Sequence, residues 1–398
     1  MSVFHQSAVD RPKMRAYRLG RIRQQLRARD YAGILLMDPV NLRYATDVSN
    51  MQVWVLHNKT RYVFIATDGP VILFDYAVAT HLSADAEVID ETRPAIGHTY
   101  FSNGLRQREK IADWAVQIAD LVTQHGGGNR RLAIDKLDPQ ASFALAKLGV
   151  EITDGEEAME HARAIKSAEE IVAIRESIAA CQAGIEVMYR AMQPGMTENE
   201  LWALLHKTNI ELGGEWIECR LLASGERTNP WFQECSDKMI RKGEMVSFDT
   251  DLIGPNGYCA DISRSWICDA KPTDEQHRLY QTALDNLHHN LSLVKAGVGF
   301  REFTEKSFHL TEEFVDRRYS CIMHGVGLCD EYPFAVYRED YEKHGFDAPF
   351  EAGHTVCIEA LIGAVGGKEC VKLEQQILVT ETGYELLSTC PLGLQPSY

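Results

Sequence analysis

The segment from residue 246 to residue 264 carries three aspartates at a spacing that could build a cation site. Asp249 and Asp251 lie in one β-like run, and Asp261 lies in a second run beyond a Gly-Pro-Asn-Gly turn. Because side chains alternate along a strand, we expect Asp249 and Asp251 on one face, to which the hairpin returns Asp261. Neighbouring carboxylates resist joint ionisation unless a cation compensates them. This hairpin therefore predicts a metal site.

Three further candidate ligands follow along the chain. His324 precedes a Gly-Val-Gly run, whose glycines allow another backbone to approach closely, and Glu359 and Glu374 each lie in a strand-like run. One imidazole and five carboxylates suit two divalent ions of intermediate hardness, such as Fe, Mn, Co or Zn, rather than a thiolate site. Taken singly, such a histidine is more often a core residue and such a carboxylate is usually exposed. The prediction depends on the whole set.

The pattern of helices and strands predicts two domains, in keeping with a length of 398 residues. The first pattern alternates, with helices expected at 13–29 and 106–124 and strands at 33–37, 62–66, 71–74 and 131–134. The second is expected to have helices at 168–192, 198–212, 274–295 and 301–316, a strand-rich stretch at 217–268 and mostly strands after residue 316. We expect Thr197 and Glu200 to form a capping box at the start of one of these helices. The boundary is expected within 156–166, giving domains of residues 1–160 and 161–398.

Composition narrows the class of partner. A net charge of -16 argues against a phosphate-backbone partner, so no nucleic acid is expected and a small-molecule substrate is favoured. No stretch approaches the length of apolar sequence that a membrane span needs. The basic amino terminus lacks the apolar run of a secretory signal, and the 10 cysteines are irregularly spaced and expected to be reduced. These features predict a cytoplasmic enzyme.

Several segments together resemble the creatinase/prolidase/methionine aminopeptidase superfamily. They are the stretch from Tyr31 to Tyr44, the motif Arg163-Ala-Ile-Lys166-Ser167, the turn Pro194-Gly195-Met-Thr-Glu198, and the series Asp249 or Asp251, Asp261, His324, Glu359 and Glu374. The resemblance covers nearly the whole chain. It implies an α/β (α+β) protein, in which a creatinase-like amino-terminal domain precedes a pita-bread domain with metals between its sheets.

The chain departs from the superfamily pattern at positions that matter for hydrolysis. Trp231 and Asp330 stand where the family's motifs have histidines. Amide hydrolysis requires a polarised carbonyl and a protonated leaving amine, work that those histidines would assist. Their absence argues against peptide or guanidino hydrolysis. Glu359-Ala-Leu and Lys372-Leu-Glu374 also differ from the family's Glu-Pro-Gly and Arg-x-Glu.

The spacing of the aspartates differs as well. Asp249 and Asp251 lie twelve and ten residues before Asp261, whereas the usual family pair is eleven residues apart. This extra carboxylate, together with Trp231 and Asp330, resembles the dimethylsulfoniopropionate lyase branch. The resemblance implies cleavage of dimethylsulfoniopropionate to dimethyl sulfide and acrylate by metal-assisted β-elimination, with iron as the expected metal.

The same resemblance suggests roles for individual side chains. Asp330 is expected to be the general base, and Trp231, Tyr319 and Trp54 are expected to bind the sulfonium cation through their aromatic faces. A homodimer is implied, in which the amino-terminal domain of one subunit closes the partner's site. The alternatives for these residues are a turn-capping aspartate and ordinary core aromatics. For the whole chain, the alternatives are an Xaa-Pro-type metallopeptidase, a non-catalytic metal- or betaine-binding protein, and a creatinase-like hydrolase, which the full set of metal ligands disfavours.

Overall fold

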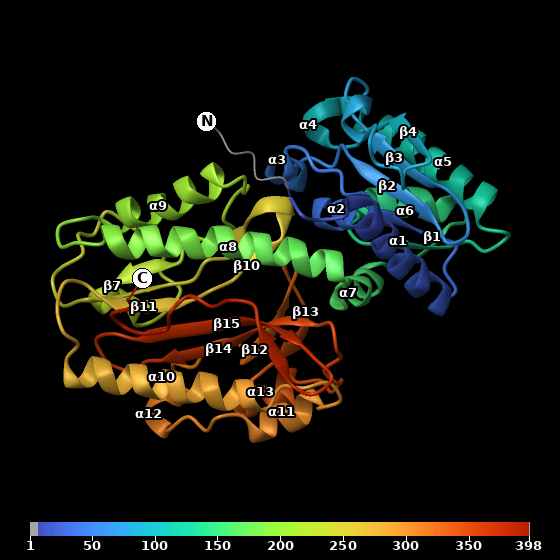
Figure 1. Ribbon diagram of the computed structural model, residues 1–398. Coiled ribbons are helices and arrows are strands. Elements are labelled where there is room, and N and C mark those ends of the chain that lie inside the picture. The colour runs from blue at the N-terminus through green and yellow to red at the C-terminus, as the bar shows by residue number, and fades with distance from the viewer. Residues whose placement is uncertain (1–6, 398) are drawn as a thin grey trace. The chain divides into compact units, whose positions relative to one another are not determined.

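The computed structural model describes residues 7–397, and the chain divides into two compact units (Figure 1). One unit is Asp10–Arg163, and the other runs from Ala164 onward and includes residues 7–9. Both units combine helices with a β-sheet, which confirms the predicted fold class. In the described part of the chain, no helix combines the length and the apolar character that crossing a membrane requires.

The first unit is built around a mixed six-stranded sheet with strand order β4-β3-β2-β1-β5-β6. Its strands are β1 (Gly33–Leu36), β2 (Tyr62–Ala66), β3 (Val71–Asp75), β4 (Glu91–Pro94), β5 (Arg131–Ile134) and β6 (Glu151–Asp154). Its helices are α1 (Arg11–Ala28), α2 (Pro39–Thr46), α3 (Gln52–His57), α4 (Tyr100–Asn103), α5 (Gln107–His125), α6 (Pro139–Lys147) and α7 (Glu156–Ala164). The central strands are buried along their whole length, as their continuous apolar runs predict.

Helices α2, α3, α4, α6 and α7 were not expected from the sequence, although two of them begin at a recognisable signal. Asp38 and Asp138 precede α2 and α6, and each accepts a hydrogen bond from a backbone amide of the first turn. The proline that follows each aspartate has its φ angle fixed near the helical value and lacks the amide hydrogen that a first turn cannot use. Asp38-Pro39, interpreted as the end of a strand, therefore also starts a helix.

The second unit contains all the predicted metal ligands. Its strands are β7 (Leu222–Ser224), β8 (Met245–Phe248), β9 (Leu252–Ile253), β10 (Cys259–Ala260), β11 (Arg264–Ile267), β12 (Met323–Val326), β13 (Asp330–Ala335), β14 (Thr355–Ile362), β15 (Val371–Val379) and β16 (Tyr384–Leu386). They form a five-stranded antiparallel sheet of order β13-β12-β14-β15-β16, a three-stranded sheet β11-β8-β7 and the pair β10-β9.

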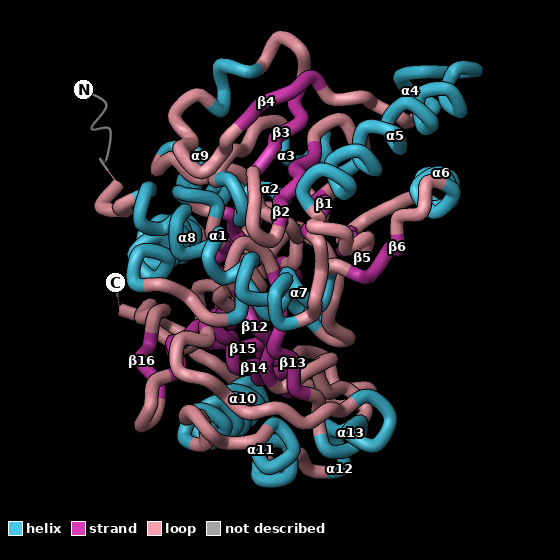
Figure 2. Tube along the Cα trace, turned by 90° about the vertical axis from the view of Figure 1, so that its right-hand side faces the viewer, coloured by secondary structure: helices cyan, strands magenta, loops and turns pink. Residues whose placement is uncertain are grey.

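Helices cover these sheets from two sides (Figures 1 and 2). They are α8 (Ala168–Ala191), α9 (Glu198–Glu211), α10 (Asp274–Ser292), α11 (Phe300–Lys306), α12 (Glu312–Val315) and α13 (Arg338–His344). Helices α8 and α9 lie on one side, and α10 to α13 lie on the other, where a large apolar core fills the space between α10 and the five-stranded sheet. The predicted capping box of Thr197 and Glu200 is present at the start of α9.

The helix expected at 301–316 is wrong in its middle, since α11 ends at Lys306 and α12 begins at Glu312. The Ser307 side chain donates a hydrogen bond back to the Thr304 carbonyl, and the Phe308 amide donates to Asn290 Oδ1 at 2.8 Å. Because a side chain of α10 takes the amide that would continue the helix, the chain leaves its helical path there. The expectation of mostly strands after residue 316 also missed α13.

Candidate metal centre

The hairpin that carries the three aspartates opens in its middle. Phe248 pairs with Arg264 at the end of the β8–β11 ladder, and Leu252 pairs with Ala260 at the start of the β9–β10 ladder. Between the two ladders, residues 249–251 face residues 261–263 outside any strand. The expectation of one continuous run is therefore wrong. The acidic side chains therefore lie where the backbone does not follow the regular ladder of a hairpin.

Asp249 and Asp251 both lie in that interruption but belong to different groups of side chains. Asp251 has a φ of 36°, in the left-handed region, so simple strand alternation does not apply to it. Its carboxylate lies close to Asp330, whereas the Asp249 carboxylate lies close to Glu359 and Glu374. The two neighbours in sequence thus serve different groups of side chains.

The imidazole of His324 lies at the centre of the acidic cluster. His324 is on β12 at a β-bulge, and Glu359 of β14 is directly opposite Glu374 of β15. His324 Nε2 is 3.3 Å from Glu359 Oε1, 3.5 Å from Asp261 Oδ2 and 3.7 Å from Glu374 Oε1. On its other edge, His324 Nδ1 is 3.5 Å from Asp330 Oδ1. Strands far apart in the sequence therefore converge on one ring.

All six predicted metal ligands belong to three neighbouring groups, within each of which the ligand atoms lie no more than 4.8 Å apart. The groups are Asp261, His324, Cys357 and Glu374; Asp251, Cys259 and Asp330; and Asp249, Glu359 and Glu374. The thiols of Cys259 and Cys357 were not among the ligands expected from the sequence. Their signal was spacing, because Cys259 and Cys357 each lie two residues before a candidate ligand on a strand or at its end, and such residues share a face.

A buried lysine was also missed as a member of the cluster. Lys372 Nζ is 3.0 Å from Asp249 Oδ2, 2.6 Å from Glu359 Oε2 and 3.7 Å from Glu374 Oε2, and its side chain is 0% exposed. Ser263 Oγ lies 2.6 Å from Asp249 Oδ1 and 2.8 Å from Glu374 Oε2. The spacing Lys372-Leu-Glu374 on β15 was the available signal, since it puts the ammonium and the carboxylate on one face.

The carboxylates of the cluster differ in how far neighbouring groups offset the effect of burial on their pKa values. Burial alone would raise the pKa of Asp249, but the Lys372 ammonium and the Ser263 hydroxyl reverse this effect and lower the pKa to about 2. Burial, together with the charges of Asp249 and Asp330, raises the pKa of Asp251 to about 7. Burial and the neighbouring Glu374 raise the pKa of Asp261 well above its usual range. Asp251 and Asp261 therefore have no lysine or arginine beside them, and His324 is the cationic group nearest to Asp261.

These side chains fit a divalent cation. Glu374 Oε1 is buried, faces His324, and has no hydrogen-bond partner within residues 7–397. Leaving such an oxygen without a donor or a cation is costly. The set of carboxylate oxygens and one imidazole nitrogen matches the ligands that divalent transition metals of intermediate hardness accept.

Asp330 differs from the rest of the cluster because solvent reaches it. It begins β13, and its side chain is 56% exposed, whereas the His324 side chain beside it is 8% exposed. Partial desolvation, opposed by His324 and assisted by Asp249, raises the pKa of Asp330. Asp330 thus places a carboxylate at the open edge of the centre.

Two of the three predicted aromatic residues lie near this cluster. Trp231 is buried in a small apolar group with Leu361, against which Tyr319 packs. Tyr319 stacks on Phe232 with ring centroids 5.4 Å apart, and Lys372 Nζ lies 4.5 Å from the centroid of the Tyr319 ring. The Tyr319 ring thus already faces one cation.

Trp54 belongs to α3 of the first unit. Its side chain is 38% exposed, and its ring centroid lies 6.1 Å from that of Tyr76. Its assignment to the substrate site stays a prediction.

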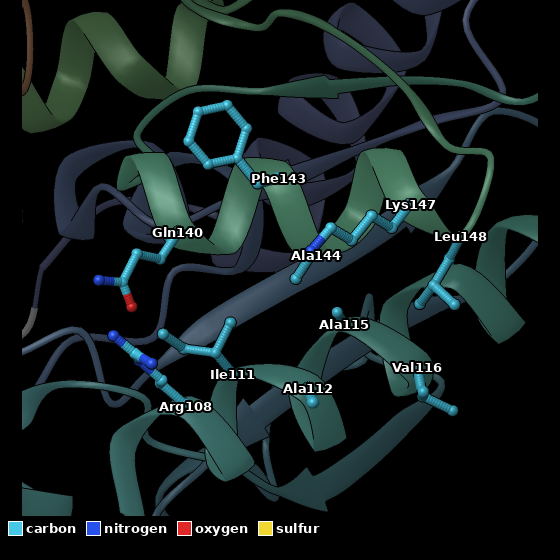
Figure 3. Close-up of a pocket in the computed structure, with 10 residues that line it drawn as sticks. All are labelled: Arg108, Ile111, Ala112, Ala115, Val116, Gln140, Phe143, Ala144, Lys147 and Leu148. Atoms are coloured by element: carbon cyan, nitrogen blue, oxygen red, sulfur yellow. The ribbon is translucent and has the colours of Figure 1, made fainter. Parts of the chain in front are cut away.

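The first unit also has an apolar groove between α5 and α6 (Figure 3). Ile111, Val116 and Phe143 line it, and Arg108 and Lys147 are its charged residues. It contains none of the carboxylates or histidines that a metal site needs. The acidic cluster of the second unit is therefore the better candidate for chemistry.

Comparisons with known proteins place this geometry in a family. The model of metallopeptidase family M24 matches residues 172–381, and that of the creatinase/prolidase N-terminal domain matches residues 18–165. The chain is 44% identical to a protein named dimethylsulfoniopropionate lyase DddP from Roseovarius nubinhibens, over 96% of this chain and 87% of that protein. It is 41% identical to the protein of the same name from Roseobacter denitrificans, over 98% and 89% of the two chains.

Solved structures agree on the fold. An Xaa-Pro dipeptidase from Bacillus anthracis matches with a TM-score of 0.76 and 23% identity, covering 96% of this chain and 99% of that one. The prolidase from Pyrococcus horikoshii matches with a TM-score of 0.74 and 19% identity over 95% and 99% of the chains. At such identities the likeness concerns the fold alone. The chain belongs to metallopeptidase family M24, in the branch that includes the two relatives named dimethylsulfoniopropionate lyase.

Proposed function

We propose that this protein is a lyase that cleaves dimethylsulfoniopropionate to dimethyl sulfide and acrylate by β-elimination. The names of two relatives, 44% and 41% identical over nearly the full chain, support this substrate. The observation that carries the chemistry is the half-exposed carboxylate of Asp330, 3.5 Å from the buried His324 at the edge of an acidic cluster. A base beside a cation-binding cluster is what removal of a proton next to a carboxylate requires.

In this proposal two divalent transition-metal ions are held by Asp249, Asp251, Asp261, His324, Glu359 and Glu374. Iron is our first choice, with Mn, Co and Zn as alternatives. When bound, such ions supply Lewis-acid stabilisation of the negative charge that develops on the substrate carboxylate, an effect of several kcal/mol. The raised pKa values of Asp251 and Asp261, which have no lysine or arginine beside them, support a cation-binding role.

Asp330 is proposed as the general base. It accepts the proton from the carbon next to the substrate carboxylate, and the electrons of that C–H bond form the double bond of acrylate. The bond between the β-carbon and sulfur breaks, and sulfur leaves with the electron pair as neutral dimethyl sulfide. A neutral leaving group needs no acid, so the departures at Trp231 and Asp330 from the peptidase pattern do not impede this reaction.

The sulfonium group is a permanent cation, for which aromatic faces are suitable partners. Each face contributes roughly 0.5 to 2 kcal/mol, depending on desolvation. Trp231 and Tyr319 pack together beside the acidic cluster and are proposed to bind it. Trp54 is proposed to contribute from the partner subunit of a homodimer.

Exposed apolar side chains on and beside α3 support the proposed homodimer. Met51, Val53 and Leu56 are all about half exposed, and Trp54 lies among them. Apolar side chains gathered in this way often mark an interface. The cytoplasmic location expected from the sequence stays a prediction.

Headspace detection of dimethyl sulfide above purified protein supplied with dimethylsulfoniopropionate tests the proposed reaction. We expect release that stops with a strong chelator and returns when a divalent metal is restored. Metal-loaded protein that releases no dimethyl sulfide would overturn the proposal.

The second candidate is an Xaa-Pro-type metallopeptidase, which the shared fold of the Bacillus anthracis dipeptidase favours. Release of proline from an Xaa-Pro dipeptide by the same preparation would decide for it. Tight binding of a betaine without turnover of either substrate would instead indicate a non-catalytic binding protein.

A further inference from the structure

Lys372 occupies the middle of one of the three ligand groups. The carboxylates that its ammonium contacts are Asp249, Glu359 and Glu374, at 3.0, 2.6 and 3.7 Å. These are the members of a group whose oxygens lie within 4.8 Å of one another, close enough to share a metal ion. The lysine therefore already supplies a cation where an ion bound by this group would lie.

The ammonium is firmly held in that position. Its side chain is 0% exposed, and Nζ also donates a hydrogen bond to Ser263 Oγ at 2.7 Å. A buried ammonium keeps its charge when carboxylates surround it, and charges repel strongly at short range in a site shielded from water. A divalent ion cannot use these oxygens without displacing Lys372 or tolerating its repulsion.

The other two groups meet the ammonium less. Within residues 7–397, neither Asp251 nor Asp261 forms an ion pair with a lysine or an arginine. Asp261 instead faces the imidazole of His324, and Glu374, which contacts Lys372 through Oε2 at 3.7 Å, turns its other, unpartnered oxygen to the same ring. A divalent ion beside His324 can therefore use oxygens that Lys372 does not contact.

We propose that Lys372 is an internal cation that makes the two metal positions unequal. The position that uses Asp261, His324 and Glu374 binds its ion tightly, and the position that depends on Asp249 and Glu359 binds weakly because Lys372 competes for it. The inference rests on the metal centre proposed above. It adds that the second ion exchanges readily and that Lys372 sets its affinity.

An aromatic ring lies beside the ammonium. The aromatic ring of Tyr319 lies 4.5 Å from Lys372 Nζ, so the ammonium has a second favourable partner if an ion takes the carboxylates. A lysine has a flexible four-carbon stem, which permits such a shift.

Calorimetric titration of metal-free protein with Mn²⁺ tests the proposal. We expect wild-type protein to bind one ion tightly and a second at least about tenfold more weakly, because of the ammonium's repulsion. Lys372→Met should strengthen the weak site by about tenfold or more, since it removes that charge. Lys372→Arg retains the charge and should retain the difference between the sites.

A matched control is Lys238→Met. Lys238 also forms a partly buried ion pair, with Glu244, and donates to Ser224, but it contacts none of the carboxylates of the centre. It should leave both Mn²⁺ affinities unchanged. Equal affinities in wild-type protein, or a second site in Lys372→Met that is no stronger than in wild type, would overturn the proposal.

Lys372→Met removes the ammonium from three buried carboxylates and is expected to lose stability without metal. Thermal unfolding at increasing Mn²⁺ supplies a second measurement, because an ion that binds only the folded state raises the melting temperature according to its affinity. The rise should be larger for Lys372→Met than for wild type, and an equal or smaller rise would count against the proposal.

Wild-type protein that binds no Mn²⁺ would overturn the metal centre itself, whereas two equal sites would overturn this inference alone.

Discussion

At the scale of single residues, the centre separates the groups that bind cations from the group that can move a proton. His324 and Glu374 are buried and surrounded by other ligand candidates, whereas the Asp330 side chain is 56% exposed. A base must reach its substrate, and a metal ligand need not. Substitutions at these positions should therefore separate metal binding from turnover.

Asp330→Asn should keep the metal content of the protein and lower kcat by about 10²- to 10⁴-fold, the usual contribution of a general base. The amide preserves the size of the side chain but cannot accept the proton. Turnover is measured by headspace dimethyl sulfide, and metal content by elemental analysis. His324→Ala is the matched comparison and should lose metal as well as activity. Full activity in Asp330→Asn would refute the assignment of the base.

Trp231→Leu should raise KM for the sulfonium substrate about 2- to 30-fold, which corresponds to the loss of one cation–π contact. Leucine retains an apolar side chain in the buried group around Trp231 but has no aromatic face. Trp231→Phe and Tyr319→Phe keep a ring and should change KM little. Steady-state kinetics on the four proteins make this comparison, and equal KM values for Trp231→Leu and wild type would exclude Trp231 from the site.

At the scale of elements, β13 brings Asp330 to His324, and a buried ion pair fixes the start of that strand. Glu331, next to Asp330, accepts a hydrogen bond from Lys166, and both side chains are almost fully buried. The Lys166 amide also donates to the Gly353 carbonyl, just before β14. The segment that follows α7 is thus tied to the strand on which the proposed base lies.

Lys166→Met should lower both the melting temperature and kcat, because Glu331 would lose the buried ammonium that holds the start of β13 in place. Loss of one partner of a buried pair costs about 3 to 5 kcal/mol. Lys166→Arg retains the charge and should recover most of kcat, and KM should change less than kcat in both variants. A Lys166→Met protein that is less stable but has an unchanged kcat would show that the pair supports only the fold.

Elements with a strong local signal were predictable from the sequence, and elements formed by distant contacts were not. The α9 cap at Thr197 and Glu200, and the apolar strands β2 and β5, depend on neighbouring residues, and the structure has them where the sequence indicated. The break after Lys306 depends on Asn290, which lies on another helix. No local pattern reports such a contact.

The same distinction holds within the site. The types and order of the metal ligand candidates were visible in the sequence, and the structure brings them together. The spacing of Lys372 and Glu374 could be read from the sequence, but the contacts of Lys372 with Asp249 and Glu359 could not, because those residues lie on other segments. Only the folded chain reveals that Lys372 reaches Asp249, Glu359 and Glu374 and forms no ion pair with Asp251 or Asp261.

At the scale of the whole molecule, the exposed apolar side chains around α3 predict self-association. Leu56→Asp should shift sedimentation from dimer to monomer, since burial of a charge at an interface is costly. If Trp54 serves the partner's site, this variant should also lose activity, and it should regain activity at high protein concentration. Leu105→Asp, a substitution at an exposed leucine outside α3, is the control and should stay dimeric. A wild-type protein that sediments as a monomer would contradict the proposed dimer.

Removal of metal should destabilise one of the two units and spare the other. All the metal ligand candidates lie in the unit that begins at Ala164, where Asp251 and Asp261 have no lysine or arginine as an ion-pair partner within the described residues. A metal at about one hundred times its dissociation constant adds about 2.7 kcal/mol to the folded state. For a unit of this size that corresponds to roughly 5 to 10 °C in melting temperature.

Scanning calorimetry with and without chelator measures this effect. The chelator should lower the melting temperature of the unit that begins at Ala164 and leave that of Asp10–Arg163 unchanged, because the sheet of Asp10–Arg163 contains no member of the cluster. A uniform shift of both transitions would mean that the units unfold together, and no shift at all would mean that the cluster binds no metal that stabilises the fold.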